Sequence, residues 1–207
     1  LVYRRHGELA GAEDALIEDA ALDSFQRFRD LDRAREDGSD AWKGKNTGAF
    51  LTWLKREEGP AFTEPDLGVI PREANNVDCV VNANVLLALG LAGKTQMPGF
   101  GDATHLMTRA ITEHAWPECG LYYPQRMMFP YTLSRAYRDG GVRTPELTAA
   151  LGTLMRDVMA GQAADGHFDG GADRSHDLST ALAVVALLNL GEHTARDAQR
   201  QPNQAGG

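Results

Sequence analysis

The chain has 207 residues, of which 43% are hydrophobic and 7% aromatic, and these proportions are ordinary for a soluble globular domain. The formal net charge is −8 at pH 7 and the acidic residues are scattered, which argues against a nucleic-acid-binding surface. The sequence contains no apolar run long enough to cross a bilayer and no signal-peptide pattern, so we expect one cytoplasmic domain with no membrane contact.

Three segments begin with polar side chains and then become largely apolar: residues 78–91, 126–137 and 176–190. A helix that is hydrophobic on all sides must be surrounded by other helices, so we expect these segments to form an inner layer. Their starts are 48 and then 50 residues apart, a spacing that favours stacked helical hairpins. Pro130 should either kink the second segment or mark its true first turn.

Ordinary amphipathic helices are predicted around the inner segments. Residues 13–35 combine apolar positions with many charges, and Asp102 can cap a helix that continues to about residue 111. Thr144 followed by Pro145 is typical of an N-cap with proline at the first helical position. We expect these helices to form a half-exposed outer layer within a domain of residues 1–191. Residues 192–207 have no apolar periodicity, which predicts a flexible tail.

Polar side chains gather at the starts of the three inner segments. Cations that converge at helix N-termini make an anion site, because backbone N–H groups add to their positive potential. A nearby carboxylate or imidazole could take a proton from a nucleophile. Each of these residues could instead be structural, as a partner of a helix dipole or of a buried carbonyl. The candidates are Asp78, His176 and Asp177 as catalytic groups, and Asn82, Tyr123, Arg126, Tyr131 and Arg174 as substrate-binding groups.

Two cysteines, Cys79 and Cys119, give no disulfide framework in the sequence. Asp78, Cys79 and His176 imitate a zinc ligand set at the starts of inner helices. Adjacent residues on a helix point about 100° apart, however, so Asp78 and Cys79 do not easily converge on one ion. We therefore predict no metal site.

Several strings are familiar. Asp165-Gly166-His167-Phe168, the run from Asp177 to Ala183 and the run from Leu187 to Gly191 resemble the repeat of the terpenoid cyclase and protein prenyltransferase superfamily, the α/α toroids. The string from Val77 to Leu86 is similar to the matching inner helix of another repeat. The resemblance covers roughly residues 45–191 and implies an all-α fold of stacked hairpins.

A closed toroid of this superfamily uses about six hairpins, which requires more chain than is present here. The resemblance therefore implies an incomplete toroid that a second protein chain completes. Open ends of such an array would expose apolar helix faces.

The absence of two acidic sequence motifs narrows the range of reactions that this chain could catalyse. The sequence has no Asp-x-Asp-Asp string for protonation and no Asp-Asp-x-x-Asp string to hold magnesium and diphosphate, which disfavours terpene cyclisation. The closest likeness is to the two-subunit toroid enzymes of azabicycle biosynthesis, found in azinomycin-type secondary metabolism. These enzymes form an aziridine ring by expelling sulfate from an amino-acid-derived intermediate held on a small acidic carrier protein.

This likeness implies a hetero-partner, no redox cofactor, and roles for individual residues. Arg126, Arg174 and His176 would hold the leaving sulfate, while Asp78 would orient or deprotonate the substrate amine. Two alternatives stay open at this point. One is a terpene cyclase or prenyl-transfer enzyme of the toroid type, which needs diphosphate and metal, and the other is a non-catalytic scaffold subunit.

Overall fold

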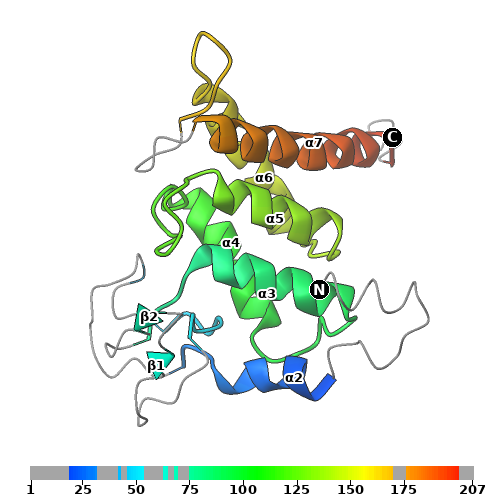
Figure 1. The fold of residues 1–207 in the computed structure, drawn as a ribbon. Helices are drawn as coiled ribbons and strands as arrows, with labels where there is room; N and C mark the ends of the chain where they lie inside the picture. Colours follow the sequence, from blue (N-terminus) through cyan, green and yellow to red (C-terminus); the bar gives the residue numbers. More distant parts are fainter. Residues whose placement is uncertain are drawn as a thin grey trace, which may run out of the picture.

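The computed structural model describes residues 19–31, 42, 46–53, 63–64, 68–69, 75–169 and 176–200. Within these ranges the structure is helical apart from loops, two isolated bridges and one pair of two-residue strands (Figure 1). The strands β1 (Thr63–Glu64) and β2 (Gly68–Val69) are antiparallel. The predicted all-α fold class is confirmed. No helix in the described part of the chain combines the length and the apolar character that crossing a membrane requires.

The observed helices at residues 79–91, 128–138, 145–160 and 176–200 match predicted segments. The helix expected over residues 13–35 is wrong in its described part, because the helix ends at Arg27 and Arg29 pairs with Phe50 in an isolated bridge. The predicted cap at Asp102 is also wrong, because Asp102 is the third residue of a helix whose N-cap is Gly99.

Pro130 is the third residue of its helix, so it marks the first turn, where a missing N–H costs no hydrogen bond. The last helix extends past residue 191, where we expected the domain to end. Its final residue is also the last residue that the structure describes. The helices are α2 (Asp19–Asp23), the 3-10 helix η2 (Ser24–Arg27), α3 (Cys79–Leu91), α4 (Phe100–Thr112), α5 (Met128–Arg138), α6 (Pro145–Ala160) and α7 (His176–Arg200).

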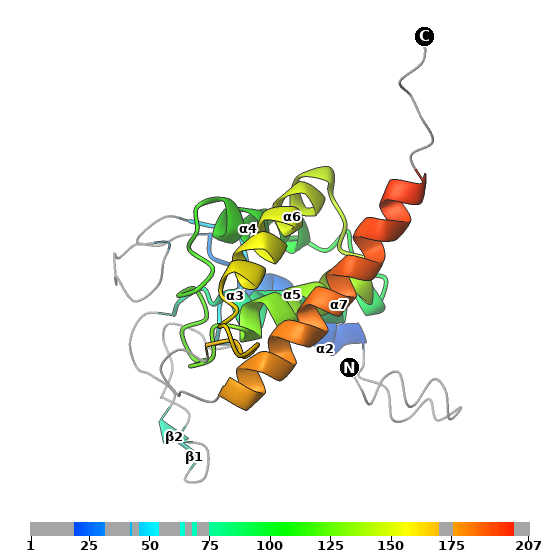
Figure 2. The ribbon, with the colours of Figure 1, turned by 90° about the horizontal axis from the view of Figure 1, so that it is seen from above.

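The five long helices form two layers. Helix α5 packs between α3 and α7, and these three helices make the predicted inner row, while α4 packs against both α3 and α6 (Figures 1 and 2). The inner helices run in the same direction. The start of α3 is bonded to the loop that leads into α5, and Asn189 of α7 contacts Ser134 and Arg138 near the end of α5. The N-terminal ends of all three inner helices therefore lie on the same side of the row.

The helix starts follow local rules that the sequence already contains. The Thr144 hydroxyl accepts a hydrogen bond from the Leu147 N–H at 3.1 Å, with Pro145 at the first helical position, which confirms the predicted cap. Helix α3 begins with Asp78 as its cap and then buries side chains all around, from Cys79 to Leu89. An apolar helix of this kind has to be covered on every side.

Helix α3 and the end of α5 approach each other through glycines. A Cβ atom placed on Gly90 would lie 2.0 Å from the carbonyl oxygen of Gly140, so only glycine fits at this crossing. A Cβ atom on Gly140 would in turn lie 3.2 Å from the Cα of Leu87. The backbones are therefore in direct contact, and the inner row depends on this contact.

The expectation that the two cysteines give no disulfide framework is wrong. Cys79 and Cys119 are buried and form a disulfide, with their Cα atoms 5.5 Å apart. The reason is tertiary, because α4 must turn back on α3 before residue 119 meets residue 79. In the chain-entropy account, a bond across a loop of this length stabilises the fold by about 4 kcal/mol.

Replacing Gly90 tests the close contact between the inner helices. We expect Gly90→Ala to lower the free energy of unfolding by about 3 kcal/mol, because the added methyl overlaps backbone that cannot move freely. Gly101→Ala in α4 is the matched control, since a Cβ there meets nothing within 4 Å, and it should cause no loss. Urea unfolding of both variants measures the difference, and equal stabilities would contradict direct backbone contact.

Candidate functional site

Asp78 lies at the start of α3 and is completely buried. One carboxylate oxygen accepts the Val81 N–H at 2.9 Å and caps the helix, and the other accepts the Tyr122 N–H at 3.3 Å. Burial raises the pKa of this carboxyl, and the backbone donors offset the rise only in part. Asp78 thus joins the first turn of α3 to the loop before α5.

Asn82 lies one turn further along α3 and is also completely buried. Its amide oxygen accepts the Phe50 N–H at 2.9 Å, and its amide nitrogen donates to the carbonyls of Phe50 at 2.8 Å and Asp78 at 2.9 Å. The side chain pairs with the backbone of residue 50 as a neighbouring strand would. Asn82 was predicted to bind substrate or, alternatively, to satisfy a buried carbonyl, and these contacts match the second, structural role.

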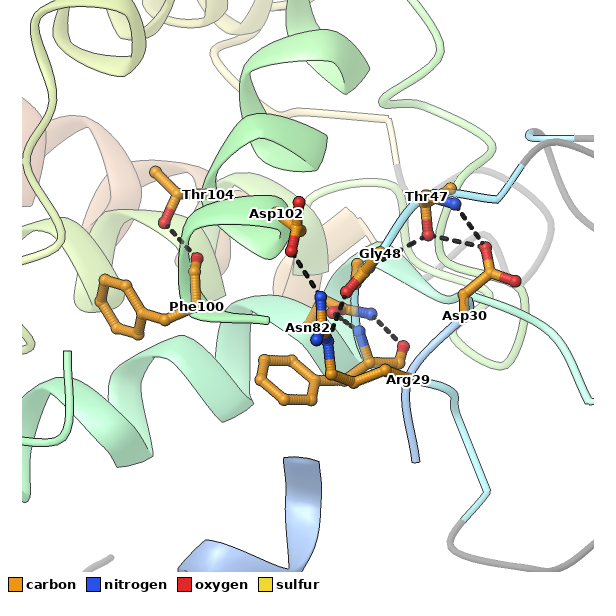
Figure 3. A network of polar contacts seen from close by, with 10 residues as sticks. Arg29, Asp30, Thr47, Gly48, Asn82, Phe100, Asp102 and Thr104 are labelled. Atoms are coloured by element: carbon orange, nitrogen blue, oxygen red, sulfur yellow. Dashed lines mark hydrogen bonds and ion pairs between the residues drawn. The ribbon is translucent and has the colours of Figure 1, made fainter. Parts of the chain in front are cut away.

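A polar network surrounds this anchor and fastens residues 29–31 and 46–50 to α3 and α4 (Figure 3). The Arg29 guanidinium donates to the Gly48 carbonyl at 2.9 Å and to the Asp102 carboxylate at 2.6 Å. Asp30, which is buried, accepts both the N–H and the hydroxyl of Thr47 at 2.8 Å. The sequence pattern did not single out Arg29, Asp30 or Thr47, because their partners are 17 or more residues away.

A cavity of about 310 Å³ lies between this fastened segment and the adjacent face of α3. Of the predicted site residues, Tyr123 lines it. Burial and the nearby Asp78 carboxylate raise the pKa of the Tyr123 hydroxyl, so the phenol stays protonated and can donate a hydrogen bond. The cavity wall is otherwise mostly apolar. Its lining residues are Phe25, Phe28, Phe50, Leu51, Thr52, Val81, Asn84, Val85, Ala88 and Tyr123.

The start of α5 places two further predicted residues. Arg126 lies two residues before the helix and is exposed. Tyr131 is half-buried, and the Arg135 guanidinium carbon lies 5.8 Å from the centre of its ring. Neither residue lines the cavity. The Arg126 guanidinium therefore lies outside the cavity, on the side of the inner row where the helices start.

The start of α7 places His176 and Asp177, both exposed. The ring of His176 lies 4.4 Å from that of His167, whose Nδ1 is 2.5 Å from the Asp165 carboxylate. The His167 backbone N–H and, to a smaller degree, its ring lower the pKa of Asp165. Arg174 lies outside the described residues. Sequence reasoning did not propose His167, although it belongs to one of the repeat strings.

The predicted site residues thus fall into separate groups within the described structure. Asp78, Asn82 and Tyr123 gather at the start of α3, while His176 contacts His167, and no described hydrogen bond or ion pair joins the two groups. Across the ranges that the structure describes, no set of three or more His, Cys, Asp or Glu residues is placed to hold a metal ion. The described geometry thus has an apolar cavity beside α3 and, apart from it, exposed polar side chains at the starts of α5 and α7.

Comparison of the chain with models of protein families, with curated proteins and with solved structures finds no match. The functional assignment therefore depends on the residues and the fold themselves.

The raised pKa of Asp78 has a consequence for stability. Since the folded state holds this proton more tightly than the unfolded chain, the contribution of Asp78 to the free energy of unfolding falls as pH rises from the ordinary value of 3.8 through the raised folded pKa. Asp78→Asn keeps a capping oxygen but has no titratable group, so this contribution should disappear from its pH profile.

The measurement is chemical denaturation of both proteins at a series of pH values from about 3 to 8. The free energy of wild type minus that of the variant should fall with rising pH across the window and then become constant. A difference that rises with pH would show that the backbone donors outweigh burial and that the pKa is lowered.

Proposed function

We propose that this chain is one subunit of a heteromeric, toroid-like enzyme whose partner chain packs against α7. The observation that carries the proposal is an exposed apolar stripe on that helix. Leu178, Val184, Val185 and Leu188 are between 40% and 62% exposed. Contiguous exposed apolar side chains mark an interaction surface. We call these four residues the α7 stripe.

The opposite side of α7 supports this interpretation. Its buried side chains include Leu182, Ala183, Ala186 and Leu190, and α7 contacts mainly α5. At the other end of the row, the segments at residues 25–31 and 46–53 are fastened over α3 by the polar network described above (Figure 3). Within the described residues, the row is thus covered beyond α3 and open beyond α7. A helix from a partner would continue the row there.

Charge placed in the α7 stripe should break the association. We expect Leu188→Glu to weaken binding of the partner about tenfold or more, because a carboxylate would have to be buried against apolar surface. Met159→Glu is the matched control, since Met159 is an apolar residue on the outer helix α6 that is 52% exposed, against 62% for Leu188. The experiment co-expresses the tagged chain with the chains encoded beside it and measures co-elution. Unchanged co-elution of Leu188→Glu would place the interface elsewhere.

For the reaction, we propose closure of a small nitrogen-containing ring with loss of an anionic group such as sulfate. The substrate amine forms a new N–C bond, the C–O bond to sulfate breaks, sulfate leaves with the electron pair, and a base takes the amine proton. The common direction of the inner helices supports this proposal, because it brings the polar N-terminal ends of α5 and α7 to the same side of the row.

The residue roles follow from exposure and contacts. Arg126 and His176 are exposed and can hold the departing anion, together with Arg174. Asp177 is exposed and would act as the base in this scheme, while both oxygens of Asp78 already accept backbone N–H groups, which favours an orienting role for it. Tyr123 and Tyr131 would contact the substrate near the helix starts, where a carrier protein could present it.

Removing a leaving-group contact tests these roles. We expect Arg126→Ala or His176→Ala to lower the rate of sulfate release by the assembled complex about a hundredfold, as loss of one charged donor to a transition state does. Arg156→Ala, an exposed arginine on α6, should leave the rate unchanged. Near-normal rates in both test variants, with the complex intact, would place the chemistry in the partner chain and favour a scaffold role.

The cavity favours a second candidate function. Three phenylalanines and a tyrosine line it, and none of its lining residues is charged, which suits an isoprenoid chain. A prenyl-transfer or terpene enzyme would release diphosphate instead of sulfate and would depend on an added divalent metal ion. Metal-dependent release of diphosphate from prenyl diphosphates would support this candidate over ring closure.

A further inference from the structure

We propose that the Cys79–Cys119 disulfide is a redox control on the cavity. With the bond intact, the cavity binds an uncharged, mostly apolar molecule, and reduction of the bond by a dithiol weakens that binding. The two cysteines connect the first turn of α3 with the loop of residues 119–123. The same loop supplies Tyr123 to the cavity wall.

The disulfide is the covalent member of a set of ties between these two segments. The Cys79 N–H donates to the Cys119 carbonyl at 3.0 Å, and the Tyr122 N–H donates to Asp78 at 3.3 Å. The Tyr122 hydroxyl accepts hydrogen bonds from Asn76 at 2.7 Å and from the Trp53 indole at 3.1 Å. Each of these hydrogen bonds is weak by comparison with the covalent S–S bond.

Three parts of the cavity wall meet at this point. Helix α3 contributes Val81, Asn84, Val85 and Ala88, and its first turn carries Cys79. The loop contributes Tyr123, the neighbour of Tyr122. The segment at residues 50–52 is joined to the loop through Trp53, whose ring also packs edge-on against Tyr122. A change at the disulfide therefore reaches these three parts of the wall through direct contacts or through one intervening residue.

The chemistry of the step is simple. Two electrons and two protons from the dithiol break the S–S bond and leave two thiols, while the dithiol becomes a disulfide. Because both cysteines are buried, the reductant reaches them only when the loop opens locally. Two thiols cannot lie as close as bonded sulfurs in a packed interior, so the loop and the start of α3 move apart after reduction.

The lining defines the ligand. A volume of about 310 Å³ admits a molecule of up to about three rings or a short branched chain, and the absence of charged lining residues disfavours an ion. Thr52, Asn84 and the protonated Tyr123 hydroxyl can hydrogen-bond one polar group. This occupant is distinct from the anion that we assign to the exposed helix starts.

The test uses N-phenyl-1-naphthylamine, an uncharged apolar fluorescent probe, with the full chain. We expect the dissociation constant of the probe to rise at least about tenfold after treatment with dithiothreitol, as free thiols per chain rise from none to two. Ala88→Phe fills the cavity and should abolish the tight binding in the oxidised protein, which separates the cavity from the α7 stripe. Cys79→Ser/Cys119→Ser should bind weakly with or without dithiothreitol.

Two results would overturn the proposal. One is equal probe affinity in oxidised and reduced protein whose thiol counts differ by two. The other is two free thiols in protein purified without reductant. Circular dichroism of the reduced protein accompanies the titration, and if the double serine variant does not fold, the comparison of oxidised and reduced wild type with Ala88→Phe decides the question alone. The partner chain is not needed, so the outcome is independent of the proposed reaction.

Discussion

An almost wholly apolar helix is stable in water only when every side of it is covered, and α3 imposes this constraint on the rest of the structure. Helix α5 covers one side and α4 another. The segments at residues 25–28 and 50–52 cover a third side incompletely, which leaves the cavity. The loop of residues 119–123 closes the start of the helix. Each described element near α3 can be understood as one of its covers.

Covering α3 also forces polar groups out of water, and the structure satisfies them with backbone partners. Asp78 is desolvated, which costs free energy in its charged form, but it receives two backbone N–H groups. Asn82 binds both the N–H and the carbonyl of Phe50. Asp78, a predicted catalytic group, and Asn82, a predicted substrate-binding group, thus attach the covers to the helix. Arg126, His176 and Asp177 are exposed and available to a ligand.

The same constraint explains the two ends of the inner row. Beyond α3, non-repeated segments are attached by the Arg29, Asp30 and Asn82 contacts. Beyond α7, the described chain offers no cover for Leu178, Val184, Val185 and Leu188. An array that is sealed at one end and apolar at the other is suited to growth by association. This asymmetry is the physical basis for the proposed partner chain.

Most of the long helices could be predicted from the sequence, because periodicity and capping are local. Thr144 with Pro145 fixed the start of α6, and the spacing of the inner segments indicated their common layer. Asp78 at the head of an apolar run likewise marked the start of α3. The tertiary structure was needed to show which of the predicted polar residues already bind backbone groups and which are exposed. Two contacts join residues that are 32 or more positions apart: the disulfide between Cys79 and Cys119 and the hydrogen bonds between Asn82 and Phe50. The cavity beside Tyr123 depends on how the loops return to α3. Local patterns carry no information about such distances, because they arise from how packed helices bring remote segments together.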